Sequence, residues 1–127
     1  MLNLSASTRI FFCTQPVDMR RSFDGLQGLI AQFFGHDLLS GHLFVFRNRR
    51  GDRLKILYWD RDGLAIWYKR LEQGVFRMPA LAGDAHSVEI DPRDWALILS
   101  GIDLSSARRL PRYRLPDRQQ TPAVATG

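Results

Sequence analysis

The sequence has few of the residues that build metal and catalytic sites. Its single cysteine, Cys13, excludes an internal disulfide and a cysteine-based zinc site, and as part of an apolar run it reads as a small core residue. The three histidines, His36, His42 and His86, show no metal-ligand spacing. The sequence also has no glycine-rich phosphate loop followed by lysine. We therefore expect neither a metal nor a cofactor.

Long apolar segments are absent as well. No run of 18 apolar residues and no basic-then-apolar leader occurs, which predicts a cytosolic protein without a membrane span or a secretory signal. A length of 127 residues, with 45% hydrophobic and 24% charged residues, fits an ordinary globular domain. We expect one α+β domain over residues 1–104 and a basic, disordered C-terminal arm over residues 105–127.

Positive charge is concentrated in two parts of the chain. Of the formal net charge of +5, residues 1–46 contribute zero, 47–77 contribute +5, 78–103 contribute −4 and 104–127 contribute +4. Sixteen of the 18 cations are arginines, which favour forked contacts to phosphate or carboxylate. The alternative is a basic surface with no specific partner.

Residues 42–79 show the pattern of consecutive β-hairpins. Apolar, aromatic-rich runs are separated by the triplets Arg49-Arg50-Gly51, Arg61-Asp62-Gly63 and Glu72-Gln73-Gly74. A three-residue hairpin loop is usually a type I turn followed by a residue with positive φ, a conformation that glycine adopts without a clash. This geometry predicts strands over 42–48, 52–60, 64–71 and 75–78. It pairs Asn48 with Asp52, Asp60 with Leu64 and Leu71 with Val75.

This register assigns every side chain of the hairpins to one face of the sheet. The predicted core face collects Phe44, Phe46, Leu54, Ile56, Tyr58, Leu64, Ile66, Tyr68, Phe76 and Met78. The opposite face carries Trp59 and Trp67 among basic residues, and it aligns Val45, Lys55, Lys69 and Arg77 across the four strands. Since like charges directly opposite one another destabilise a sheet, this row predicts an anionic partner.

The flanking segments complete the fold prediction. Residues 8–14 are expected to form a short strand at the sheet edge, and residues 87–90 one more strand. Asp18 is expected to cap an amphipathic helix over 19–34 that covers the core face. Asp91 and Pro92 open a second helix that runs to about Ser100 and stops at Gly101. The predicted fold is α+β: an antiparallel four- to six-stranded meander sheet packed against an amphipathic helix, with a second short helix near the C-terminus.

Five blocks of the chain resemble a known family. They are PVDMRRSFDGL from Pro16, LFVF from Leu43, NRRGDRLKIL from Asn48, WD at Trp59 with DGL from Asp62, and YKRLE from Tyr68. The chain is similar through them, over about residues 2–115, to the TnpB (second open reading frame) accessory proteins of insertion sequence sixty-six type elements. The resemblance implies a small bacterial protein encoded beside a separate transposase and needed for transposition. It supplies no catalytic residues.

The residues do not favour an enzyme. Asp60 and Asp62 flank a tight turn and could bind a divalent cation, but aspartate is also favoured in turns because its side chain bonds to nearby N–H groups. The serines lack the local signature of an activated nucleophile. A small nuclease that uses these two aspartates is a third interpretation. The transposase reaction needs a carboxylate constellation around a metal, which the chain does not visibly have, and the resemblance places that reaction on another protein.

Two functions remain open. The first is a non-catalytic accessory factor that binds DNA, at element ends or without sequence preference, and takes part in DNA recombination. Its nucleic-acid-binding residues would be Arg47, Arg49, Arg50, Arg53, Lys55, Lys69, Arg77, Arg108, Arg109, Arg112 and Arg114, with Trp59 and Trp67 as aromatic contacts. The second is a protein–protein adaptor that docks on the transposase, or on another element-encoded protein, without touching DNA.

Overall fold

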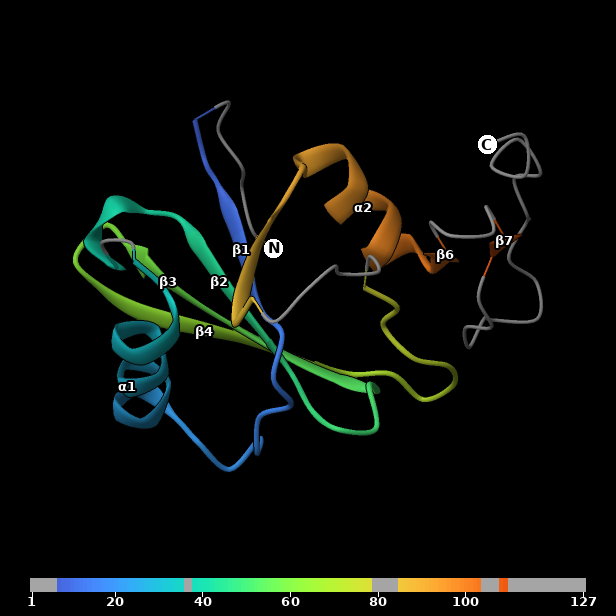
Figure 1. Cartoon of the computed structure of the whole chain (residues 1–127), viewed down its shortest axis with the longest axis horizontal. Coiled ribbons are helices and arrows are strands. Elements are labelled where there is room, and N and C mark those ends of the chain that lie inside the picture. The colour runs from blue at the N-terminus through green and yellow to red at the C-terminus, as the bar shows by residue number, and fades with distance from the viewer. Residues whose placement is uncertain (1–6, 36–37, 79–84, 104–107, 110–127) are drawn as a thin grey trace.

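The protein is built on a five-stranded mixed sheet with one α-helix against each face (Figure 1). The computed structural model describes residues 7–35, 38–78, 85–103 and 108–109. The sheet has the order β4-β3-β2-β1-β5, with β1 (Ile10–Cys13), β2 (Leu43–Arg47), β3 (Arg53–Asp60), β4 (Gly63–Arg70) and β5 (Ser87–Ile90). The helices are α1 (Phe23–Phe33), α2 (Pro92–Ser100) and the short 3-10 helix η1 (Leu38–Ser40). A separate pair joins β6 (Ile102–Asp103) to β7 (Arg108–Arg109).

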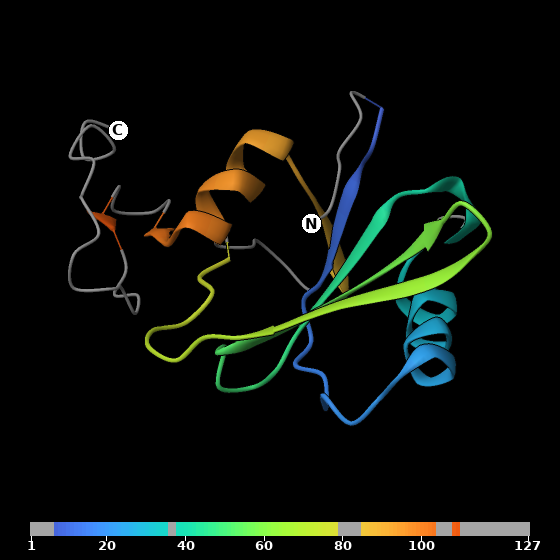
Figure 2. The ribbon, with the colours of Figure 1, turned by 180° about the vertical axis from the view of Figure 1, so that it is seen from behind.

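The sheet has a hydrophobic core on each side, because alternate residues of its central strands are buried in opposite directions. On one side Leu26 and Ile30 of α1 pack with Phe11, Phe44 and Leu57 of the sheet. The core on the other side consists of Phe12, Val45, Ile56, Trp95 and Ile98 with their neighbours, the last two from α2. Figure 2 shows the two helices on opposite sides of the strands. In the described residues the face opposite α1 therefore carries a packed core, and it is not the open, cationic face that was predicted.

The predicted register of the first two hairpins is wrong by one residue at each turn. Arg47 lies opposite Leu54, and the Asn48 N–H donates to the Arg53 carbonyl at 3.2 Å, so the β2–β3 turn has the four residues 49–52. The Asn48 side chain closes this wider loop. The β3–β4 turn has two residues, with Asp60 opposite Gly63. There Arg61 takes the positive φ, at 60°, and the indole Nε1 of Trp59 donates to its carbonyl at 3.2 Å.

The first error inverts β3 relative to β2, and the second restores the predicted orientation in β4. Because one turn is longer and the next is shorter than predicted, Phe44, Phe46, Leu64 and Ile66 share a face, as expected. Strand β3 is inverted, so its residues Leu54, Ile56 and Tyr58 face α2 instead of α1. Phe76 and Met78, which were also predicted for the face under α1, pack in the core on the α2 side. The cross-strand rows are Val45–Ile56–Trp67 and Phe46–Lys55–Tyr68.

Strand β1 was predicted at the sheet edge, but it lies between β2 and β5. It pairs parallel with β2 through Ile10 opposite Leu43, and antiparallel with β5 through Ile10 opposite Ile90. The α+β class, the meander β2-β3-β4 and the strand over 87–90 are confirmed. The all-antiparallel arrangement is wrong, because the chain crosses through α1 between β1 and β2 and so brings the two strands together in parallel.

The helix ends follow from their local hydrogen bonds. In α2 the Asp91 carboxylate accepts from the Arg93 N–H at 2.7 Å, and Gly101 follows the helix with φ of 86°, as predicted. Helix α1 begins at Phe23, later than predicted, and Asp18 does not cap it. The carbonyls of Met19 and Arg21 instead accept hydrogen bonds from Lys55, which keeps residues 19–21 out of the helix.

The predicted fourth strand over 75–78 is an extended segment without strand pairing. The turn before it contains Gly74 with φ of 85°, as the triplet predicted. The N–H groups of Leu71 and Phe76 donate to the carbonyls of Asp52 and Gly51, so the segment is tied to the β2–β3 turn.

The predicted C-terminal arm lies mostly outside the described residues, and its disorder stays a prediction. Residues 108 and 109 form β7, which pairs with β6 through Asp103 opposite Arg108. Within the described part of the chain, no helix has the length and apolar character needed to cross a bilayer.

Candidate anion-binding groove

A groove of about 740 Å³ is lined by two segments that lie far apart in the sequence. One is the connection between β1 and α1, residues 15–21, and the other is the β2–β3 turn with the start of β3. Leu29 and Phe33 of α1 and Tyr68 of β4 complete the lining. Four arginines and one carboxylate face this space: Arg20, Arg21, Arg49, Arg53 and Asp18.

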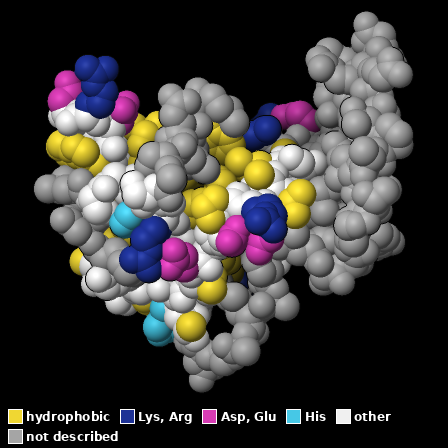
Figure 3. All heavy atoms as spheres, turned by 90° about the horizontal axis from the view of Figure 1, so that it is seen from above, with side chains coloured by type: hydrophobic (Ala, Val, Ile, Leu, Met, Phe, Trp, Pro, Cys, Tyr) yellow, Lys and Arg dark blue, Asp and Glu magenta, His cyan; other side chains and the backbone are white. Residues whose placement is uncertain are grey.

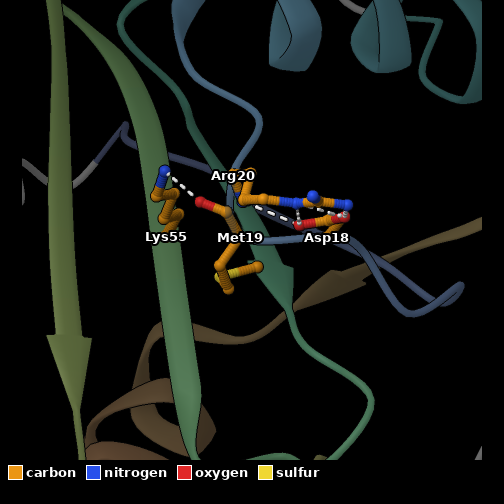
Figure 4. A network of polar contacts seen from close by, with 4 residues as sticks. All are labelled: Asp18, Met19, Arg20 and Lys55. Atoms are coloured by element: carbon orange, nitrogen blue, oxygen red, sulfur yellow. Dashed lines mark hydrogen bonds and ion pairs between the residues drawn. The ribbon is translucent and has the colours of Figure 1, made fainter.

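Lys55 fixes the first wall of the groove to the sheet (Figure 4). Its ammonium donates to the Met19 and Arg21 carbonyls, both at 2.7 Å, and the residue is only 8% exposed. The Val17 N–H also donates to the Arg47 carbonyl at 2.9 Å. Hydrogen bonds from a charged donor are stronger than neutral ones, so residues 17–21 are held in place although they form no regular element.

Asp18 and Arg20 form the ion pair of this wall (Figure 4). The guanidinium donates from Nε and Nη2 to the carboxylate at 2.6–3.1 Å, and the Arg20 N–H donates to Oδ1 at 2.9 Å. These hydrogen bonds from Arg20, with the charges of Arg20 and Arg21, lower the pKa of Asp18 to about 2. Asp18 therefore stays ionised and offsets the charge of one arginine.

Asn48 organises the second wall. Its side-chain oxygen accepts from the Gly51 and Arg53 N–H groups, both at 3.0 Å, and its amide donates to Asp52 at 2.8 Å. That hydrogen bond, with the charges of Arg50 and Arg53, lowers the pKa of Asp52. An asparagine that bonds to nearby main-chain groups fixes the turn, and the turn positions Arg49 and Arg53 at the groove.

The arginines of the groove have little acidic compensation. Among the described residues no carboxylate lies within ion-pair distance of Arg21, Arg49 or Arg53. Figure 3, which views the molecule from above, shows a contrasting surface where Lys and Arg side chains lie beside Asp and Glu side chains. The Arg9–Glu89 pair, at 2.7 Å, illustrates such local neutralisation. Four guanidiniums around one lining carboxylate, Asp18, leave an excess of positive charge that raises the local potential and attracts anions.

The predicted row of cations does not exist. Lys55 points toward α1 beside Phe46 and Tyr68, whereas Lys69 is opposite Leu54 and points to the other side of the sheet. The predicted exposure of Lys55 is also wrong, since it is buried and bonded to main-chain carbonyls. Trp59 and Trp67 likewise point to opposite faces, and Trp67 packs partly against the core under α2.

The other predicted nucleic-acid-binding residues are distributed around the molecule. Arg49 and Arg53 line the groove, and Arg50 is exposed on the same turn. Arg47 donates to the Phe76 carbonyl at 2.7 Å, and its pKa is lowered by burial and by the nearby charge of Arg77. The side chains of Arg108 and Arg109, and all of Arg112 and Arg114, lie outside what the structure describes.

The structure brings in residues that the sequence reasoning had not assigned to the site. The sequence predicts a helix that contains Arg20 and Arg21 and is capped by Asp18, and it predicts Tyr68 on the core face. The available signal was the sequence PVDMRR, which concentrates charge next to a proline, but nothing in the sequence indicated that it lies beside the turn that begins at Asn48.

No metal centre is assembled in the described part of the chain. No three side chains among its histidines, cysteine, aspartates and glutamates come close enough together to hold an ion. Asp60 and Asp62 are both exposed at the β3–β4 turn, where the Asp62 N–H donates to the Asp60 carbonyl at 2.6 Å.

Comparison with known proteins relates the chain to one family. The sequence model described as "IS66 Orf2 like protein" matches residues 8–109. The chain is 37% identical over 114 residues to the uncharacterized protein y4jC of Sinorhizobium fredii, a match that spans 90% of this chain and 96% of that protein. It is 36% identical over 103 residues to the uncharacterized protein y4hO of the same organism, spanning 81% and 88% respectively. No solved structure matches the chain significantly.

Proposed function

Because the chain belongs to the IS66 Orf2 like family, and thus to the accessory proteins of insertion-sequence elements, we propose that it binds the DNA backbone through the arginine groove. In this proposal the protein is non-catalytic. It acts with the separate transposase of the element, and its contacts to DNA are made by Arg21, Arg49 and Arg53.

The observation that supports this proposal is the convergence of three arginines that have no carboxylate partner among the described residues. Gathering like charges costs free energy in the free protein, and an anionic ligand relieves that cost. Arginine presents a planar fork that matches the geometry of phosphate. Because backbone phosphates are the same at every base pair, such contacts give affinity without reading sequence.

Salt dependence of binding tests the proposal. Three neutralised phosphates predict that the logarithm of duplex affinity falls with the logarithm of salt concentration at a slope of about −2.7. Arg49→Ala and Arg53→Ala should each weaken binding and reduce the magnitude of the slope by about 0.9. Arg93→Ala is the matched control, because Arg93 is exposed on α2 and does not line the groove.

A gain of affinity gives an independent test. Asp18→Asn keeps an oxygen for the Arg20 N–H but removes the charge that holds the Arg20 guanidinium. DNA affinity should therefore rise, and the slope should become steeper by about 0.9. Glu72→Gln is the control, since it releases Arg70 from a similar exposed pair that is not in the groove.

The opposite result would favour the adaptor. If the purified protein retained no DNA at low salt but co-purified with the transposase, and Arg49→Ala abolished that complex, the guanidiniums would bind acidic side chains of the partner. The DNA-binding proposal would then be refuted.

A further inference from the structure

Tyr68 is an aromatic side chain held in the groove without being buried. It lies on β4 opposite Lys55 of β3, lines the groove and is 48% exposed. In the described part of the chain it is the most exposed large hydrophobic side chain, ahead of Phe23 at 42%. An exposed ring beside arginines is the combination that proteins use to bind unpaired nucleotides.

The ring is fixed by the cations next to it. The Lys55 ammonium lies 4.8 Å from the ring centroid, and Arg53 Nη1 donates to the hydroxyl at 3.3 Å. A cation over the ring face attracts it through the ring quadrupole. Since Lys55 is itself bonded to the carbonyls of Met19 and Arg21, the ring, the sheet and the β1–α1 connection form one continuous support.

The groove also has an apolar part. Val17, Met19, Leu29 and Phe33 contribute to its lining together with the arginines. Contacts to phosphates alone do not require apolar walls, whereas a nucleobase has an apolar face and gains from stacking and desolvation. The volume of about 740 Å³ lies in the range of sites that enclose small molecules.

We infer that the groove takes an unpaired nucleotide of single-stranded DNA, with its base stacked on Tyr68 and the adjoining phosphates on Arg21, Arg49 and Arg53. This inference rests on the proposed DNA binding and specifies the form of DNA that is bound. Bases inside a duplex stack on each other, so their faces are not available to Tyr68. A single-stranded end, a loop or a flipped base presents them.

The test compares three labelled oligonucleotides of one length: a single strand, its duplex, and the single strand with abasic sites at every second position. We expect the wild-type protein to bind the single strand best, with a salt slope of about −2.1 for three phosphates. Tyr68→Ala should weaken single-strand binding about tenfold and leave duplex binding unchanged within twofold. Tyr68→Phe keeps the ring and should bind like the wild type, and Arg93→Ala serves as the surface control.

The abasic strand keeps the test decisive even if Tyr68→Ala does not fold, because it removes the base and keeps the phosphates. Abasic and duplex DNA that bind the wild type as tightly as the intact single strand would overturn this inference and leave the proposed function standing. Failure to bind any of the three at low salt would overturn both. Unlabelled poly-glutamate and unlabelled single strand are also compared, at equal charge concentration, as competitors of the labelled single strand. If both compete to the same extent, the assignment of the groove to a nucleotide is overturned.

Discussion

Replacing Lys55 by methionine separates the role that the sequence predicted from the role that the structure assigns. Methionine keeps an unbranched, apolar side chain of similar length but removes the ammonium that bonds to Met19 and Arg21. If Lys55 contacted phosphate, the variant would lose DNA affinity without losing stability. If it supports the groove, stability must fall.

The size of the effect follows from two hydrogen bonds with a charged donor, each of which contributes about 1.5–3 kcal/mol. The loss of these hydrogen bonds is partly offset, because the variant no longer pays the desolvation cost of a charge at a site that is only 8% exposed. We expect a net loss of about 3 kcal/mol in the free energy of unfolding. For a chain of this size that lowers the midpoint of urea unfolding by about 1–2 M.

Urea unfolding followed by circular dichroism measures this change. Lys69→Met is the matched control, because Lys69 is exposed on the adjacent strand, and its change should stay within about 0.5 kcal/mol. Equal stability of the two variants would refute the structural role of Lys55. A salt slope reduced by about 0.9 in Lys55→Met at unchanged stability would restore the direct phosphate contact.

Three further predictions concern the pKa of one carboxylate and the stability of two parts of the fold. Asp18 should titrate near pH 2 by NMR, and Arg20→Ala should move the midpoint toward the ordinary 3.9. Since its folded pKa lies below its unfolded pKa, its contribution to stability is present above about pH 4 and lost toward pH 2. Gly51→Ala should lower the free energy of unfolding by about 1–2 kcal/mol, measured by urea unfolding, because φ is +81° at Gly51. Gly63→Ala should leave the free energy of unfolding unchanged or raise it by at most about 1 kcal/mol. Trp95→Ala should cost about 3–5 kcal/mol in the same assay, and a loss below 1 kcal/mol would contradict its place in the core under α2.

Local signals in the sequence predicted the two α-helices and the two central hairpins, but not the start of α1 or the register of the strands. The aspartate, proline and glycine around α2 act over a few residues, and their effect is visible in the order of the letters. The turn lengths were not predictable in the same way. Glycine suggested the positive φ in all three turns, but in the second turn the chain gives that conformation to Arg61 and uses Gly63 to begin β4.

Side-chain hydrogen bonds set the strand register, which the pattern of apolar residues and glycines did not predict. Asn48 closes a four-residue turn, and the resulting shift of one residue inverts β3 and turns Lys55 inward. The second helix then packs into a core on the face that had been assigned to DNA. Charge density pointed to Arg49 and Arg53, which line one groove. Their neighbours Arg20 and Arg21 could be found only from the three-dimensional contact between residues 15–21 and the β2–β3 turn.

The position of β1 ties the order of synthesis to the completion of the sheet. Its four residues, IFFC, leave the ribosome before the other strands of the sheet and are buried in the finished protein. One neighbour, β2, follows after the crossover, but the other, β5, starts only at residue 87. Until then a nascent chain carries an apolar strand with one open edge, the kind of surface that recruits other chains. A product truncated before β5 should therefore aggregate instead of merely losing a strand, so the last strand of the five-stranded sheet to be made also protects β1.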